Sequence, residues 1–121
     1  MGHIIQDVRI RADKARQIRM LVDTGATFSI IPERLARAIG VKRLRRAMAI
    51  TLADGRRVRL DAGTAFFRIG DREAPATLLV GDVAEPILGV ETLEVLGLKV
   101  DPGREKLIPS RGYAARLGGW R

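Results

Sequence analysis

Apolar and polar residues alternate with a period of two along most of this sequence, which is typical of β-strands that bury one face. Only residues 32–39 and 90–96 show helical spacing, and each stretch is followed by a glycine that can end a helix. We therefore expect an all-β domain with two short helices. The alternation predicts a long hairpin that turns at Asp54-Gly55, and further strands at 4–10, 18–22, 28–31, 66–69, 76–80, 87–89, 98–100 and 106–108.

The residue types present leave few kinds of chemistry open. The chain of 121 residues has room for one domain with one core, and it contains no cysteine. Disulfides, a thiol nucleophile and cysteine-based zinc sites are therefore excluded. The one histidine, His3, lies near the start of the chain, where we expect fraying, so neither a His-rich metal site nor a Ser-His-Asp triad is expected. Any catalysis must come from carboxylates, hydroxyls, the backbone and basic groups.

Charge and hydropathy limit the expected partners. No apolar run approaches the ~20 residues of a membrane span, and the first residues lack the features of a secretory signal, so we expect a cytoplasmic protein. The formal net charge of +8 would attract polyanions. The basic residues are scattered, however, and their densest cluster, at 42–46, has no aromatic residue nearby for base stacking. A basic β-domain that binds nucleic acid is an alternative, but not the function that we expect.

The segment 20–27 places a carboxylate where an apolar strand ends. The apolar run 20–22 leads directly into Asp23, which is followed by Thr24 and Gly25. A carboxylate in this position is costly unless hydrogen bonds satisfy it, and Gly25 permits a tight turn that aims backbone N–H groups at Asp23. Asp and Gly are also common turn residues, so the tripeptide alone leaves a purely structural role open.

Three motifs in combination resemble the retroviral-like (retropepsin-type) aspartic proteases, in particular their short prokaryotic single-domain members. Asp23-Thr24-Gly25-Ala26 resembles the catalytic loop of that family, and residues 52–56 resemble the tip of its flap hairpin. Ile87-Leu88-Gly89 resembles the signature that packs beneath the catalytic loop. The similarity runs from about residue 4 to residue 109. It implies a closed or partly open acid-protease barrel with a flap hairpin, a domain over residues 1–109 and a tail over residues 110–121.

The resemblance also implies an activity and a site. It implies an aspartic endopeptidase that hydrolyses extended polypeptides without a cofactor or a metal. Hydrolysis by carboxylates needs two of them close together, and the chain has one Asp-Thr-Gly, so the second must come from another copy in a homodimer. The implied catalytic residues are Asp23, Thr24 and Gly25. The implied substrate-binding residues are Ala26, Thr27, Phe28, Leu52, Ala53, Asp54, Gly55, Arg56 and Ile87.

Some features depart from the viral members of the family and leave alternatives open. The expected flap tip has one glycine, Gly55, among charged residues, and the helix at 32–39 lengthens the segment after the catalytic loop. Ile30 is a candidate subsite wall, with plain core as an equal alternative. The chain could also be a catalytically silent module of the same fold that dimerises or binds peptides.

Overall fold

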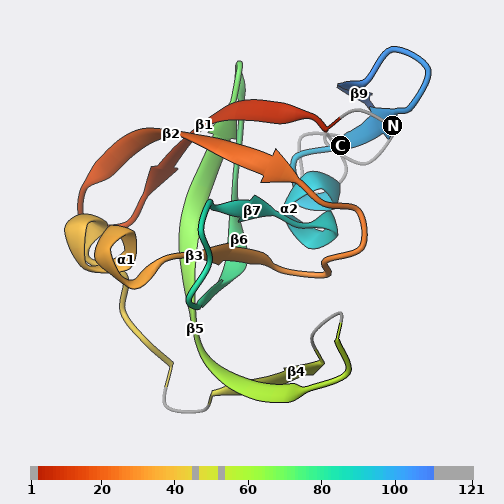
Figure 1. Cartoon of the computed structure of the whole chain (residues 1–121). Coiled ribbons are helices and arrows are strands. Elements are labelled where there is room, and N and C mark those ends of the chain that lie inside the picture. The colour runs from red at the N-terminus through yellow and green to blue at the C-terminus, as the bar shows by residue number, and fades with distance from the viewer. Residues whose placement is uncertain (1–2, 45–46, 52–53, 111–121) are drawn as a thin grey trace, which may run out of the picture.

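A computed structural model describes residues 3–44, 47–51 and 54–110 of the chain. Within these residues, two short helices, α1 (Glu33–Ile39) and α2 (Val90–Val95), interrupt a succession of strands, which confirms the predicted all-β class (Figure 1). The strands are β1 (Ile5–Arg11), β2 (Ala15–Val22), β3 (Ser29–Ile31), β4 (Met48–Thr51), β5 (Arg57–Ile69), β6 (Arg72–Val80), β7 (Ile87–Leu88), β8 (Leu98–Asp101) and β9 (Lys106–Pro109).

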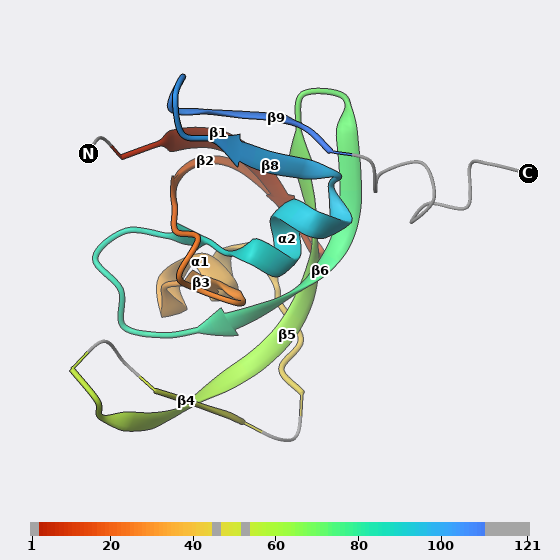
Figure 2. The same cartoon turned by 90° about the vertical axis from the view of Figure 1, so that its right-hand side faces the viewer.

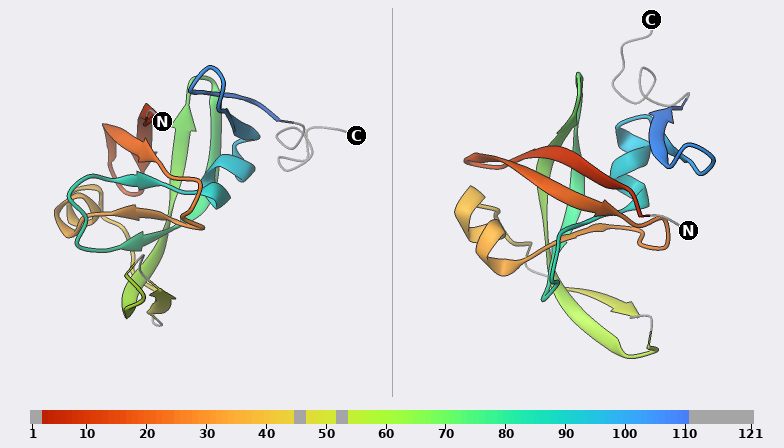
Figure 3. Two further views of the ribbon diagram at one scale, coloured as in Figure 1. Left: turned by 45° about the vertical axis from the view of Figure 1, so that its right-hand side comes forward. Right: turned by 45° about the horizontal axis from the view of Figure 1, so that its top comes forward.

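The main sheet has the order β1-β2-β7-β3-β6-β5-β4, and β1 also pairs with β5. This additional pairing places Ile10 opposite Phe67, and both side chains are fully buried. The sheet therefore curls back on itself into a partly open barrel. Helices α1 and α2 lie at opposite ends of the antiparallel β3–β7 pair (Figure 3). Strands β8 and β9 form a separate two-stranded sheet.

Strand β5 is 13 residues long and joins the barrel to the β4–β5 hairpin (Figure 2). The sequence predicted a hairpin strand and a separate strand at 66–69, and this part of the prediction is wrong. The buried face of β5 switches at Ala62 and Gly63, which are both buried, so the alternation changes phase while the strand continues. Strands β2 and β6 also begin earlier than predicted, because their hairpins pair up to the turns, at Ala15 and Arg72.

The core of the barrel is aliphatic, with Phe67 as the one aromatic side chain among the buried residues that the structure describes. Ala36 and Ile39 of α1 and Leu93 of α2 join it from the two helices. Helix α1 ends at Gly40, whose φ of 75° lies in the left-handed region that favours glycine. Neither of the helices in the described ranges is long and apolar enough to span a bilayer.

Arg43 ties the root of the β4–β5 hairpin to α1. Its guanidinium donates a hydrogen bond of 2.9 Å to Asp61 Oδ2 on β5 and another to Glu33 Oε2 on α1. The hydrogen bond from Arg43 is the main reason why the pKa of the Glu33 carboxyl lies below its ordinary value. The same contact with Glu33, followed by that with Asp61, raises the pKa of Arg43.

We expect the stabilisation that the ion pair between Arg43 and Glu33 gives to the fold to disappear at acid pH. A carboxyl whose pKa is lower in the folded chain stabilises the fold fully above its ordinary value, near 4.5 for Glu33, and this contribution is lost as the pH falls through the folded pKa. The thermal unfolding midpoints of wild type and Glu33→Gln, measured from about pH 7 to about pH 3, should therefore converge at the acid end.

Asp71→Asn serves as the control, because Asp71 lies exposed in the β5–β6 turn and makes no hydrogen bond or ion pair with the described residues. Its midpoint should follow that of wild type at every pH. A difference between wild type and Glu33→Gln that stays constant down to the acid end would contradict the expectation.

Candidate active site

The Asp23 loop begins where β2 ends and is held by its own backbone and by β7. The Asp23 N–H donates to Leu88 O at 3.0 Å, and the Gly25 N–H donates to Asp23 Oδ1 at 2.9 Å. The Ala26 N–H donates to Asp23 O at 3.1 Å and closes the turn. Asp23 is half-buried, while Thr24 and Gly25 are exposed. The carboxylate therefore has a fixed orientation and a face open to solvent.

The β7–α2 segment lies directly against this loop. Strand β7 runs parallel to β2, with Leu88 opposite Val22, and the N–H groups of Val90 and Glu91 donate to Ala26 O and Thr27 O at 2.8 Å. Gly89 makes the close approach possible, because a Cβ on it would lie 2.5 Å from the carbonyl carbon of Phe28. A side chain at Gly89 would separate the two segments.

The β4–β5 hairpin forms in the segment where the sequence predicts a long hairpin that turns at Asp54-Gly55. Met48 pairs with Leu60 and Thr51 with Arg57, and the chain turns at Asp54-Gly55, where Gly55 has a φ of 87°. Hydrogen bonds from Arg56, first from its backbone N–H, hold the pKa of the Asp54 carboxyl below its ordinary value. The hairpin curves away from the barrel toward the side on which the Asp23 loop lies (Figure 1).

A cavity of about 690 Å³ lies between the Asp23 loop and the hairpin. Among the described residues that line it, Asp23 is the only titratable one, and most of the other side chains are apolar. The lining residues are Asp23, Gly25, Ala26, Thr27, Phe28, Ile30, Met48, Ala49, Ile50, Thr51, Leu79 and Ile87. The space is large enough for several side chains of a peptide, and it presents a carboxylate at an apolar wall.

The structure brings some of the expected site residues together and leaves others apart. Thr24 adjoins the cavity without lining it. The turn residues Asp54, Gly55 and Arg56 are exposed and do not line it, while Leu52 and Ala53 lie outside the described residues. Those that line it are Asp23, Gly25, Ala26, Thr27, Phe28 and Ile87.

Several lining residues were not anticipated. The alternation along 48–52 places Met48 and Ile50 on one face, but all four residues of β4, Ala49 and Thr51 included, line the cavity. Leu79 enters through the parallel pairing of β3 with β6, where it lies opposite Ile30, and no short-range pattern reveals such a pairing. Ile30 itself is half-buried and lines the cavity, so its side chain both forms part of the cavity wall and packs against neighbouring residues.

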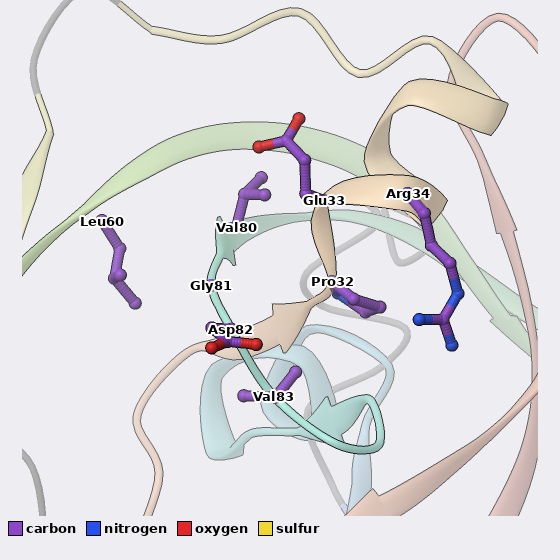
Figure 4. A pocket seen from close by; sticks show the side chains of 8 residues that line it. All are labelled: Pro32, Glu33, Arg34, Leu60, Val80, Gly81, Asp82 and Val83. Carbon is purple, nitrogen blue, oxygen red and sulfur yellow. The ribbon is translucent and has the colours of Figure 1, made fainter.

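A second cavity, of about 480 Å³, lies at the root of the hairpin and shares no lining residue with the first (Figure 4). Its charged side chains are those of Glu33, Arg34 and Asp82, and those of Glu33 and Arg34 point away from each other. Glu33 is already engaged by Arg43. In the described part of the chain, no group of three His, Cys, Asp or Glu side chains is arranged to hold a metal. The Asp23 cavity is therefore the candidate site.

Comparisons with known proteins identify the family and the fold. The model of the family described as "gag-polyprotein putative aspartyl protease" matches residues 8–95. A search of curated proteins gives no match. The solved structure "EIAV protease complexed with the inhibitor HBY-793" is similar, with 24% sequence identity and a TM-score of 0.67 over 83% of this chain and 93% of that one. This likeness confirms the expected retropepsin-like barrel.

Proposed function

The chain belongs to the retropepsin-type family of aspartyl proteases, and from this premise we propose that it is an endopeptidase that cleaves extended polypeptides as a symmetric homodimer. One observation carries the proposal: a single carboxylate, Asp23, faces a largely apolar cavity of peptide size, and no second titratable group lines that cavity among the residues that the structure describes. Each chain then supplies half of a catalytic pair. We also propose that residues 1–109 form the protease domain.

The chemistry of the pair requires both copies. Two carboxylates about 3 Å apart cannot both ionise, so they share one proton. The ionised Asp23 takes a proton from water as the water oxygen bonds to the scissile carbonyl carbon, and the protonated Asp23 gives its proton to the carbonyl oxygen. The Asp23 that took the proton from water then gives it to the amide nitrogen as the C–N bond breaks, and the other Asp23 regains a proton from a hydroxyl of the tetrahedral intermediate. The pair again shares one proton, and the products are a carboxylic acid and an amine.

Other residues have supporting roles in the proposal. Thr24, exposed beside Asp23, would hydrogen-bond to the partner copy's loop, while the backbone of Gly25 and Ala26 would approach the substrate. The apolar lining would accept apolar side chains next to the scissile bond. The hairpin would fold over the peptide, pair with its main chain and exclude water. The proposed substrate contacts are Thr27, Phe28, Ile87 and the flap-tip residues Leu52, Ala53, Asp54, Gly55 and Arg56.

Dilution tests this proposal. Cleavage of a denatured-protein or random-peptide mixture, expressed per chain, should fall as the protein is diluted below the dimer dissociation constant, because a monomer has one carboxylate. Sedimentation at the same concentrations gives the fraction of dimer. Activity per chain that stays constant where sedimentation finds only monomer would contradict the shared site. A dimer that binds the peptides and never cleaves them would favour the silent peptide-binding module.

A further inference from the structure

Two hydroxyl groups are buried side by side behind the Asp23 loop. Ser29 on β3 and Thr92 on α2 both have 0% exposure, and they are the only polar residues that are buried in the part of the chain that the structure describes. Ser29 Oγ and Thr92 Oγ1 lie 2.6 Å apart. Burying hydroxyls in an aliphatic core costs free energy unless they are hydrogen-bonded, and two apolar side chains could fill the same volume.

The pair holds one particular backbone group. The Gly89 N–H donates a hydrogen bond of 3.0 Å to Ser29 Oγ. Gly89 packs tightly against the end of the loop, since a Cβ on it would meet the carbonyl of Phe28 and the amide nitrogen of Ser29. Removing the Ser29 hydroxyl would leave a buried N–H without a partner, which costs more than a missing surface hydrogen bond.

Gly89 lies between two residues that form backbone hydrogen bonds with the Asp23 loop. Leu88, immediately before it, accepts the hydrogen bond from the Asp23 N–H, and Val90, immediately after it, donates to Ala26 O. The hydroxyl pair therefore links α2, β3 and Gly89, and through Gly89 it holds the segment on which the Asp23 backbone rests.

We propose that Ser29 and Thr92 are positioning residues that set where the Asp23 carboxylate stands relative to its copy in the partner subunit. This inference rests on the proposed function. The interaction between two carboxylates depends steeply on their separation, so a small displacement of each loop changes how they share a proton. The same displacement of the loops also moves both carboxylates relative to the substrate carbonyl and the attacking water. Small misplacements of this kind lower catalytic rates strongly.

The test compares Thr92→Val, which removes a hydroxyl and keeps the shape, with Thr92→Ser, which keeps the hydroxyl. We expect Thr92→Val and Ser29→Ala to lower kcat at least about tenfold while KM changes less than about twofold. The two apparent pKa values of the pH–rate profile should move closer together. Thr92→Ser should retain the wild-type profile. Ile39→Val, a buried change in α1, controls for lost stability and should leave kcat and the profile unchanged.

Amide hydrogen exchange provides a readout that does not need activity. In Thr92→Val and Ser29→Ala, the amides of Asp23, Gly89 and Val90 should exchange faster than in wild type and in Thr92→Ser. Unchanged kcat, profile and exchange in both variants would overturn the inference. Wild-type cleavage no greater than that of Asp23→Asn would instead refute the proposed function, and the exchange rates alone would then decide whether the pair positions the loop.

Discussion

Replacement of Asp23 by asparagine is expected to abolish peptide hydrolysis while the folded dimer persists. An amide has nearly the same shape as a carboxylate, and its oxygen can still accept the hydrogen bond that Gly25 N–H donates to Asp23 Oδ1 at 2.9 Å. It cannot take a proton from water or hold the acidic proton. Since both copies lose their group, we expect kcat/KM to fall at least about 10³-fold. Cleavage of a random-peptide mixture at acid to neutral pH measures the loss.

Asp101→Asn is the matched control for this variant. Asp101 is the last residue of β8, directly before the β8–β9 turn, and its Oδ1 also accepts an N–H two residues ahead, from Gly103 at 3.1 Å. The same chemical change is thus made in a similar turn away from the Asp23 cavity, and activity should stay at the wild-type level. Equal cleavage by wild type and Asp23→Asn would remove Asp23 from the mechanism.

Gly89→Ala is expected to destabilise the fold severely and to destroy the site. The φ of Gly89 is −94°, which any residue adopts, so the cost comes from contact alone. The added methyl group would lie 2.5 Å and 2.6 Å from the carbonyl carbon and oxygen of Phe28, and these backbone atoms cannot rotate away. We expect a loss of about 3 kcal/mol or more in the free energy of unfolding, measured with denaturant.

Gly70→Ala separates this effect from the general cost of replacing a glycine. Gly70, in the β5–β6 turn, has a φ of 61° and open space around its Cβ position, so its replacement costs only the backbone strain, about 1–2 kcal/mol. Its activity should be that of wild type. A Gly89→Ala protein as stable and as active as Gly70→Ala would show that the loop and β7 can move apart freely.

Local patterns were sufficient to predict much of the fold. Alternation predicted the strands, and the turn at Asp54-Gly55 and the helix end at Gly40 were marked by glycines that the structure places at positive φ. The continuity of β5 could not be predicted, because its buried face changes sides at Ala62 and Gly63. In the sequence alone, a change of phase in the apolar–polar alternation indicates the end of one strand and the start of another.

The candidate site was predictable only where neighbouring residues build it. The loop from Asp23 to Phe28 is one continuous motif, and it lines the cavity as a unit except at Thr24. Leu79 reaches the cavity through the parallel pairing of β3 with β6. The bond between Ser29 and Thr92 joins residues 63 positions apart. Contacts of this range depend on the barrel as a whole, so no short pattern in the sequence indicates them.

Mixing wild-type chains with Asp23→Asn chains tests the shared site most directly. The two are unfolded together in varying proportions and refolded, so that they pair at random, and cleavage is measured at a constant total concentration above the dimer dissociation constant. If only the dimer with two intact carboxylates is active, activity follows the square of the wild-type fraction, and an equal mixture retains about a quarter. Activity that is proportional to the wild-type fraction, with about half left in the equal mixture, would contradict a site built by two chains.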